Sequence, residues 1–545
     1  MSKPNSSKPL SQKMDLNLHS HSHLLAIPGL GLLLLLTLYL WRKSMKIPTT
    51  NLAPELSGAL PLIGHLHKIN SQKPIFRTLA EFADKYGPIF RFRLGVHPIL
   101  VISNYEAVKE CFTTNDQTFA SRPRSAHGTI LGYNYAAFGF APYGPYWRTI
   151  KKLVMVELLS SRRLEKLKHV QKTEVQTLIK DLYGCCDLTT KVGVVISDWI
   201  ERFTLNIITE ITASKRYFES GRGIYDDGEA QRIGKLIKEF MYISGVPVVS
   251  DLIPVPKWID IQGRLKSMKR IGKEVDDLIG SWVEEHIKKN DDIKSLSGEE
   301  SNENKKDFID VMLSVVEENS GFGYSRETII KATVSTLIIA GSDTTSLSLV
   351  WTLALLVNNR QVLKHAQEEI DRIVGKERWV EDYDIKNLVY LQAIVKETLR
   401  LYPPGPLSVP HEAWEDCTVC GYSVPKGTRL FVNVWKLHRD PTLWSDPDSF
   451  LPERFLTSHV GVEGSGHHFE FIPFGSGRRA CPGMTFALQV THLTLARLLQ
   501  GFEWSTPKEA LVDMVEGLGI TLPRVNPLEV LLSPRLNSEM LPNYV

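Results

Sequence analysis

The stretch FIPFGSGRRACPGM, residues Phe471–Met484, decides the fold. It places one cysteine, Cys481, among glycines and two arginines, and an apolar sequence with helical spacing follows as far as Leu499. Pro482 suits the first turn of a helix, where its missing N–H costs nothing. Cys481 is therefore expected at a helix N-terminus, whose free N–H groups and dipole favour a thiolate over a thiol.

The residues around Cys481 indicate what this thiolate binds. Gly477 and Gly483 would let the backbone approach a flat ligand closely, and Arg479 can pair with an anionic group. A single thiolate held in this way suits the axial position of a haem, where it favours O–O cleavage. Two other interpretations are a dinucleotide site at GSGRRA, which has no βαβ unit around it, and a buried structural cysteine.

A long apolar helix is predicted from Ile329 to Asn358, interrupted by the polar residues of AGSDTT, Ala340–Thr345. A second membrane span is disfavoured because Asp343 in its middle would cost several kcal/mol there. An ordinary buried helix, whose hydroxyls bond within the turn, is the simplest alternative. A glycine followed by side-chain oxygens can also loosen the helix and admit water. Asp343 and Thr344 would then form a proton path for O–O cleavage.

A third motif contains charged residues at helical spacing. Glu397 and Arg400 of KETLR lie three residues apart and therefore share one helical face. On its own the pair is consistent with a surface ion pair worth a few tenths of a kcal/mol. Arg454 follows further along, in the sequence PERF.

The N-terminus predicts a membrane anchor. Residues 1–23 form a polar leader, and residues 24–41 are uncharged, Leu-rich and just long enough to cross a bilayer. Aromatic and basic residues follow at once, which disfavours a cleaved signal peptide and places the rest of the chain in the cytosol. Residues 42–66 form a basic, proline-rich hinge, and residues 67–545 form the globular domain.

The rest of the chain is mostly helical, with short strands predicted near Ile99–Ser103 and Arg429–Trp435. The polar run Lys288–Lys306 is predicted as a solvated loop. The fold class is therefore mainly α with a small β subdomain. A net charge of +3 in 545 residues gives no case for nucleic-acid binding, and six cysteines are too few for a disulfide scaffold. Cys417 and Cys420 have no partner pair in the sequence that would favour a zinc site.

With these motifs together, the chain resembles the haem-thiolate monooxygenases of the cytochrome P-450 superfamily, and it matches their haem-binding signature at every position. The resemblance extends from the proline hinge to Arg535. APYGPYWR, RLYPPGPLSVPHEAWEDC and FGSGRRACPG resemble plant enzymes of the family numbered eighty-two. RLEKLKHV, DFIDVMLSVV and the C-terminal LPRVNPLEVLLSPRL are similar to nightshade-type alkaloid oxidases, a group that includes nicotine N-demethylase and tropinone synthase.

The resemblance implies roles for named residues. Cys481 is the axial ligand of haem b, Thr344 and Asp343 deliver protons to dioxygen, and Glu397, Arg400 and Arg454 form a buried structural charge cluster. The residues expected around the haem are Phe474, Gly477, Arg479, Gly483, Ala340, Trp147, Lys151 and His411. Lys151 stands where the family usually has an arginine, so this contact lacks a bidentate fork.

The same resemblance implies partners and setting. Electrons come from NADPH through a separate reductase, which would dock on the basic segment Lys151–Lys172, and the enzyme is anchored in the endoplasmic reticulum membrane. The expected walls of the substrate pocket are Ser125–Tyr135, Ala340, Leu407–Val409 and Gly517–Thr521, where apolar residues are frequent.

Those walls suit a small, largely apolar metabolite, in the first place an alkaloid of the tropane or pyrrolidine type. Homoterpene formation and flavonoid or furanocoumarin hydroxylation are alternatives within the family. A haem-thiolate isomerase or dehydratase, or a membrane-tethered scaffold without turnover, would be a different class of protein.

Overall fold

The computed structural model describes residues 51–70, 72–186, 192–218, 228–254, 256, 260, 262–297, 306–318 and 321–536. The predicted leader 1–23 and anchor 24–41 lie outside these residues, as does the first part of the hinge 42–66. The described part of the hinge adjoins the first sheet, because Glu55 and Gly64 form isolated bridges with Arg91 and Leu94.

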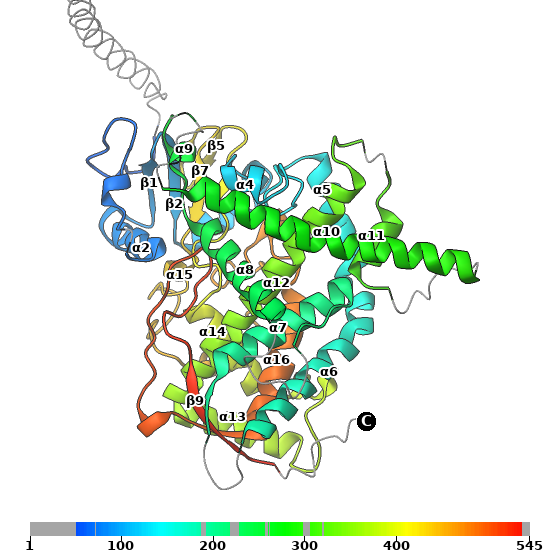
Figure 1. Ribbon diagram of the computed structural model, residues 1–545. Helices are drawn as coiled ribbons and strands as arrows, with labels where there is room; N and C mark the ends of the chain where they lie inside the picture. The colour runs from blue at the N-terminus through cyan, green and yellow to red at the C-terminus, as the bar shows by residue number, and fades with distance from the viewer. Residues whose placement is uncertain are drawn as a thin grey trace, which may run out of the picture.

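Helices make up most of the described structure, and they surround the long helix α12 (Arg326–Asn358), as Figure 1 shows. Ser325 caps its start by accepting a hydrogen bond from the N–H of Thr328 at 3.2 Å. Among the described helices, α12 is the one long and apolar enough to cross a membrane, yet 72% of its most apolar window is buried inside the protein. A helix that is apolar on all sides is typical of a protein core.

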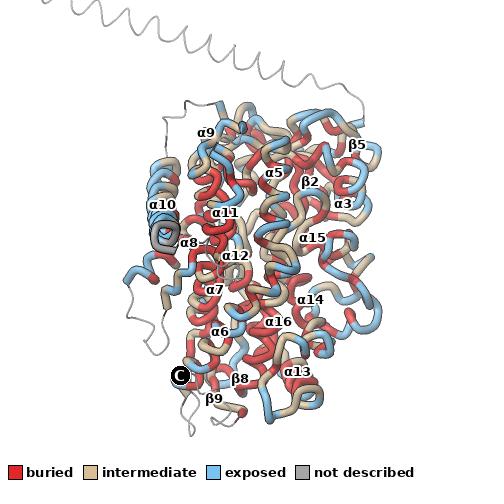
Figure 2. The backbone as a smooth tube through the Cα atoms, turned by 90° about the vertical axis from the view of Figure 1, so that its right-hand side faces the viewer, coloured by how far each residue is buried: buried red, intermediate tan, exposed pale blue. Residues whose placement is uncertain are grey.

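The longer helices besides α12 pack in layers around it, and Figure 2 shows buried residues concentrated along α7, α12 and α16. The helices of eight or more residues are α2 (Ile75–Tyr86), α3 (Tyr105–Phe112), α5 (Pro145–Leu153), α6 (Ser161–Cys185), α7 (Ile196–Ala213), α8 (Gly228–Gly245), α10 (Arg264–Ser297), α11 (Phe308–Val315), α13 (Arg360–Ile373), α14 (Val389–Leu401) and α16 (Met484–Gly501). The short helices are α4 (Ala126–Ile130), α9 (Val249–Leu252), α15 (Val434–Leu437), the 3₁₀ turns η1 (Leu66–Lys68), η2 (Thr118–Ala120), η5 (Asp382–Asn387), η6 (Pro452–Leu456), η7 (Gly477–Arg479) and η8 (Pro507–Glu509), and the π-helical turn η3 (Val154–Leu158).

The described strands form three small sheets. The largest has the order β1-β2-β7-β4, the second β3-β9-β8, and the third is the hairpin β5-β6. Their bounds are β1 (Ile89–Leu94), β2 (His97–Ile102), β3 (Val192–Val195), β4 (His411–Glu412), β5 (Cys417–Val419), β6 (Tyr422–Val424), β7 (Arg429–Val432), β8 (Phe502–Ser505) and β9 (Glu529–Pro534). These elements confirm the predicted class, mainly α with a small β part.

The largest sheet has a well-defined register. Phe90 of β1 pairs with Val101 of β2 in antiparallel fashion, and Gly95 makes the turn between the two strands with φ +65°, which a side chain would strain. β2 and β7 are parallel, and His411 of β4 pairs with Leu430 of β7. The sheet thereby places His411 at the edge of the helical core.

Two predicted boundaries shift in the structure. α10 continues to Ser297, so the first part of the polar run from Lys288 is helical rather than a loop; it prolongs a helix already nucleated upstream, which costs little. The strand predicted to reach Trp435 ends at Val432, because the side chain of Asn433 caps the short helix α15 that follows.

The proline next to the cysteine also lies elsewhere than predicted. α16 begins at Met484 with Gly483 as its N-cap residue, so Pro482 precedes the helix and does not form its first turn. Cys481 is therefore further from the helix N-terminus than its spacing indicated.

Candidate active site

One large cavity, of about 430 Å³, is lined both by α12 and by the loop that precedes α16. Segments far apart in sequence meet in it, because α5, the loop after α14, β4 and the residues after 517 also contribute to its wall. The residues singled out from the sequence that line it are Trp147, Lys151, Ala340, Thr344, His411, Phe474, Arg479, Cys481 and Gly483. Asp343 and Gly477 do not line it.

The loop that carries Cys481 is closed by its own backbone. The N–H of Cys481 donates to the carbonyl of Phe474 at 2.9 Å. Gly477 in this loop has φ +67°, and a Cβ atom there would lie 2.2 Å from Oδ1 of Asp116. Gly477 therefore admits the close approach of Asp116, a role that the sequence did not indicate.

The thiol of Cys481 lies deep in the protein, and its accessible surface faces the cavity. Burial raises the pKa of Cys481, while the backbone N–H of Gly483 and the charge of Lys151 lower it. Burial is the largest of these effects, so the pKa of Cys481 lies above its ordinary value. A stable thiolate at this position thus needs a cation bound to the sulfur, as a metal ion supplies.

Basic side chains gather around the same cavity. Arg479 donates to the backbone carbonyls of Ala120 at 2.6 Å, Phe138 at 3.1 Å and Ala141 at 2.5 Å. Arg122 donates to the carbonyls of Val409 at 2.7 Å and Pro410 at 2.9 Å.

Lys151 donates to the carbonyl of Arg478. Within the described residues, no carboxylate forms an ion pair with Arg122, Lys151 or Arg479. Burying three cations in the cavity wall without counter-ions costs free energy, unless an anionic ligand neutralises their charge.

Electrostatics supports this conclusion. Burial and then the charge of Arg122 lower the pKa of Arg479 to about 8. Burial and the charges of Arg122 and Arg479 keep the pKa of His411 well below its ordinary value, so its ring is neutral until an anion arrives. Nε1 of Trp147 is buried without a hydrogen-bond partner in the described structure. The donor set fits haem, which carries carboxylates at one edge and an iron for Cys481.

On α12 the two predicted proton carriers differ in position. Thr344 lines the cavity, and its hydroxyl donates to the carbonyl of Ala340 at 2.7 Å, four residues earlier. Asp343 lies behind the wall, where burial raises its pKa to about 6 while a hydrogen bond from Thr521 lowers it. α12 is continuous through this region, so the polar residues do not break the helix.

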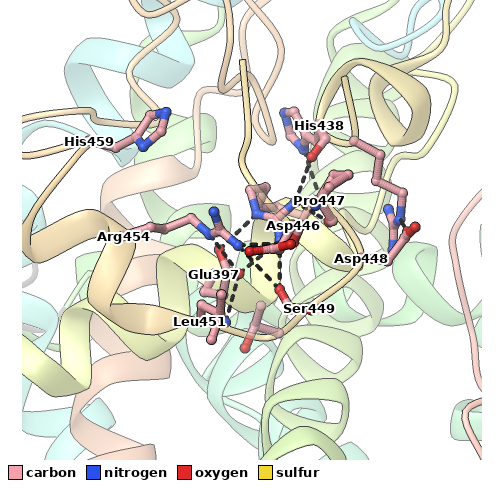
Figure 3. A network of polar contacts seen from close by, with 12 residues as sticks. Glu397, His438, Asp446, Pro447, Asp448, Ser449, Leu451, Arg454 and His459 are labelled. Atoms are coloured by element: carbon pink, nitrogen blue, oxygen red, sulfur yellow. Dashed lines mark hydrogen bonds and ion pairs between the residues drawn. The ribbon is translucent and has the colours of Figure 1, made fainter. Parts of the chain in front are cut away.

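The predicted charge cluster is present and fully buried (Figure 3). Oε2 of Glu397 accepts from Nε of Arg400 at 2.7 Å, and Oε1 accepts from Nε of Arg454 at 3.0 Å. The backbone N–H of Leu451 also donates to Glu397, at 3.0 Å. This single carboxylate therefore joins α14 to η6.

His438 links this cluster to the cysteine loop. Its Nε2 accepts from the backbone N–H of Ile472 at 3.0 Å, so its Nδ1 carries the proton and donates to the carbonyl of Arg400 at 3.1 Å. Burial, followed by the charge of Arg400, lowers the pKa of His438 to about 3, which keeps this neutral tautomer in place.

The rest of the cavity wall is largely apolar. Each predicted wall segment contributes to it, through the residues Leu131, Ala340, Ser408, Val409, Ile520 and Thr521. The sequence analysis missed Arg122 and the residues of α7 and α8 that complete the wall: Ile208, Ile211, Phe240, Met241 and Ser244. Helical periodicity identifies a buried face without distinguishing a neighbouring helix from a cavity.

Comparisons with known proteins agree with this geometry. The family model described as Cytochrome P450 matches residues 54–528. Cytochrome P450 CYP82J17 of Trigonella foenum-graecum is 55% identical over 505 residues, which cover 92% of this chain and 94% of that protein. Nicotine N-demethylase CYP82E3 of Nicotiana tomentosiformis is 52% identical over 508 residues, covering 92% and 96% respectively.

More distant similarities cover the chain as well. Xanthotoxin 5-hydroxylase CYP82C4 of Arabidopsis thaliana is 48% identical over 510 residues, with 92% of this chain and 96% of that protein covered. A solved structure of a zebra fish cytochrome P450 with progesterone superimposes with a TM-score of 0.69 at 28% identity, covering 85% of this chain and 100% of that chain.

Proposed function

The chain belongs to the cytochrome P450 family, within the plant group numbered eighty-two, and on this premise we propose that it oxidises a small, largely apolar plant metabolite, best an alkaloid of the tropane or pyrrolidine type. The family is one of haem-dependent monooxygenases that use dioxygen and receive electrons from NADPH through a reductase. The observation that carries the proposal is that Cys481 shares one cavity with Ala340 and Thr344 of α12.

A haem bound in this cavity supplies the activation of dioxygen that oxidises a C–H bond. Cys481 would hold it through the sulfur. Arg122, Lys151 and Arg479 would balance its carboxylates, and the unpartnered N–H of Trp147 offers one further donor. His411 joins them if the carboxylates raise its pKa and protonate its ring.

Proton delivery falls to the two residues on α12. The hydroxyl of Thr344 reaches the cavity, and Asp343, whose pKa of about 6 lies near the pH of the cytosol, can both take up and release a proton. Ala340 has no side chain beyond Cβ, which keeps space open beside Thr344.

The cavity wall limits the charge of the substrates that can bind. Within the described residues, its lining holds no aspartate or glutamate, and its charged side chains are the cations on the Cys481 side. An alkaloid would therefore bind as the neutral amine, through apolar contacts and hydroxyls such as those of Ser244 and Thr336. A relative named nicotine N-demethylase supports an alkaloid, and one named xanthotoxin 5-hydroxylase supports an uncharged furanocoumarin equally well.

Other candidate functions can be distinguished from a monooxygenase by the substrate, cofactor or reductase that each of them needs. Homoterpene formation and flavonoid oxidation within the family differ only in the substrate. A haem-thiolate isomerase or dehydratase would not need NADPH or a reductase, and a scaffold would not bind haem. Thr344 in the cavity favours the monooxygenase, because an isomerase needs no protons for dioxygen.

The cellular setting is part of the proposal. We place the enzyme on the cytosolic face of the endoplasmic reticulum, held in the lipid bilayer by residues 24–41, which lie outside the described structure. The reductase would dock on the basic segment Lys151–Lys172. In that segment Lys168 and Lys172 form ion pairs with Asp382 and Glu381, so fewer of its charges are available than the sequence indicates.

The deciding experiment is the carbon monoxide difference spectrum of the reduced protein in yeast microsomes. We expect the red-shifted Soret band of thiolate-ligated haem, its loss in Cys481→Ala, and its retention in the control Cys185→Ala, which alters an exposed cysteine. Turnover with reductase is then screened on N-methylpyrrolidine alkaloids and furanocoumarins. A well-folded protein without haem absorbance would leave only the scaffold, and turnover without NADPH would favour the isomerase.

A further inference from the structure

Asp116 contacts the cysteine loop, residues 474–483, which carries Cys481. It lies in the turn between α3 and η2, 362 residues before Arg478 in the chain. Its Oδ1 accepts from the backbone N–H of Arg478 at 2.9 Å, and its Oδ2 accepts from the guanidinium of Arg478 at 2.5 Å. One carboxylate therefore holds both the main chain and the side chain of a residue shortly before the cysteine.

The cysteine loop accommodates this carboxylate in two ways. Ser476, which precedes the turn η7, does not cap it, because its hydroxyl donates to the carbonyl of Gly466 at 2.6 Å instead. The N–H of Arg478 in this turn is thus left for Asp116. At Gly477 the missing side chain makes room, because a Cβ atom there would lie 2.2 Å from Oδ1 of Asp116. A larger residue at position 477 would therefore push the carboxylate away from the loop.

The other contacts of the loop fix the residues around Arg478. Lys151 donates to the carbonyl of Arg478, and three backbone carbonyls accept from the next side chain, Arg479. Within the part of the chain that the structure describes, Asp116 is the one carboxylate that pairs with the loop. Because its side chain is only 13% exposed, water competes little for these bonds. The segment that leads into Cys481 therefore starts from a residue held between Asp116 and Lys151.

We propose that Asp116 is a positioning residue for the haem thiolate, which clamps the cysteine loop through Arg478 and so keeps the sulfur of Cys481 within bonding distance of the iron. The inference rests on the proposed role of Cys481 as the haem ligand. A metal–sulfur bond tolerates displacements of only about 0.2 Å, so the loop that carries the sulfur must be rigid. Removal of a group that orients a metal ligand commonly lowers metal affinity or activity by about 10–100-fold.

The test measures the share of the haem that is bound to the thiolate. In the carbon monoxide difference spectrum of the reduced protein in microsomes, the red-shifted Soret band reports thiolate-bound haem. A band at shorter wavelength reports haem that has lost the sulfur. Asp116→Ala removes both bonds to Arg478, so the ratio of the first band to the second should fall roughly tenfold or more. Asp116→Asn keeps an oxygen for the N–H of Arg478 and loses only the ion pair, so its ratio should fall less.

A double-mutant cycle examines the ion pair by itself. Arg478→Met removes the guanidinium and keeps the backbone N–H, so its ratio of bands should match that of Asp116→Asn. The variant with both changes should be no worse than either alone, because each change removes the same ion pair.

Asp371→Asn is the matched control for these variants. Asp371 on α13 also binds an arginine far away in the sequence, Arg535 after β9, at 2.9 Å, but neither of these residues lines the cavity. This variant should therefore keep the ratio of bands of the parent protein.

Three outcomes would overturn the inference and leave Cys481 as the haem ligand: the parent's ratio of bands in Asp116→Ala, an equal loss in Asp371→Asn, or losses that add in the double variant. If Asp116→Ala folds poorly, the parent's ratio in both Asp116→Asn and Arg478→Met would overturn it too. A parent protein without the red-shifted band would instead overturn the proposed function, and the inference with it. None of these measurements needs a known substrate.

Discussion

At the scale of single residues, the site is a set of cations that form no ion pair with a carboxylate of the described residues. Arg479 is held by three backbone carbonyls, which fix its position without neutralising it. Its pKa of about 8 reflects burial and the nearby charge of Arg122. The free energy cost of these cations is offset when an anionic cofactor binds.

We therefore expect Arg479→Met to weaken haem binding by roughly tenfold or more, because a charge-assisted hydrogen bond in a buried site contributes about 1.5–3 kcal/mol. The measurement is the haem content per folded protein after dialysis against apomyoglobin. Arg162→Met, which removes an exposed arginine on α6, is the control. Equal haem retention in the two variants would contradict the role of Arg479.

Asp343 gives a prediction on pH. Its pKa is raised from 3.8 to about 6, first by burial, so the folded state favours the protonated acid. The stability that it contributes is fully present below pH 3.8 and is lost as the pH rises through about 6. Asp343→Asn does not titrate and should become more stable than the parent across this window, by at most about 3 kcal/mol.

Thermal unfolding of the haem-loaded protein between pH 4 and pH 8 measures this difference. The exposed residue Asp291 on α10 provides the control, Asp291→Asn. If the melting temperatures of Asp343→Asn and the parent stay parallel across the range, the raised pKa of Asp343 is wrong.

At the scale of elements, the charge cluster holds α14, η6 and the cysteine loop in register. Glu397→Gln removes the one carboxylate shared by Arg400 and Arg454, and leaves two cations buried without compensation. We expect a loss of about 3–5 kcal/mol, seen as poor recovery of haem-loaded protein and a lower melting temperature.

The matched control is Glu463→Gln on the exposed pair that Glu463 forms with Lys396, where the change should stay within about 0.5 kcal/mol. Comparable losses in both variants would show that the buried cluster is not what joins these elements.

α12 provides a second prediction at this scale, because it carries two threonines with the same local geometry. The hydroxyls of Thr344 and Thr352 each donate to the carbonyl four residues earlier, both at 2.7 Å, but Thr344 lines the cavity and Thr352 does not. Thr344→Ala should divert NADPH electrons from product to peroxide, while Thr352→Ala should keep its coupling. Full coupling in Thr344→Ala would exclude a part for its hydroxyl in proton delivery.

At the scale of the whole molecule, the cavity lies where separate parts of the core meet. Its wall takes Leu337 and Leu399 from the main helical core, and Val434 and Ile472 from the core around the largest sheet. A ligand that fills it contacts both parts at once. Removal of the ligand leaves the cations of the cavity wall facing an unfilled space.

The protein without haem should therefore unfold at a melting temperature lower by roughly 5–10 °C, and haem added back should restore it in proportion to occupancy. Differential scanning calorimetry on extracted and reloaded protein measures this shift. An unchanged melting temperature after haem extraction would mean that the ligand in the cavity does not couple the helical core to the core around the largest sheet.

The amino-acid sequence by itself determined the features that depend on residues close to one another in the chain. The cysteine stretch, the polar interruption of the apolar helix and the Glu397–Arg400 spacing are local patterns, and each predicted a helix. That Glu397, Arg400 and Arg454 form a buried cluster followed from the family resemblance and not from the spacing alone. Boundaries were less accurate. Pro482 does not start α16, which begins at Met484.

Only the tertiary structure decided how these motifs face one another. It brought Arg122 to the cysteine side of the cavity and placed Asp343 outside the cavity lining, next to Thr521. The physical reason is that a helix has the same local hydrogen bonds whichever way it is rotated. Its orientation is set by packing against helices that lie far away in the sequence.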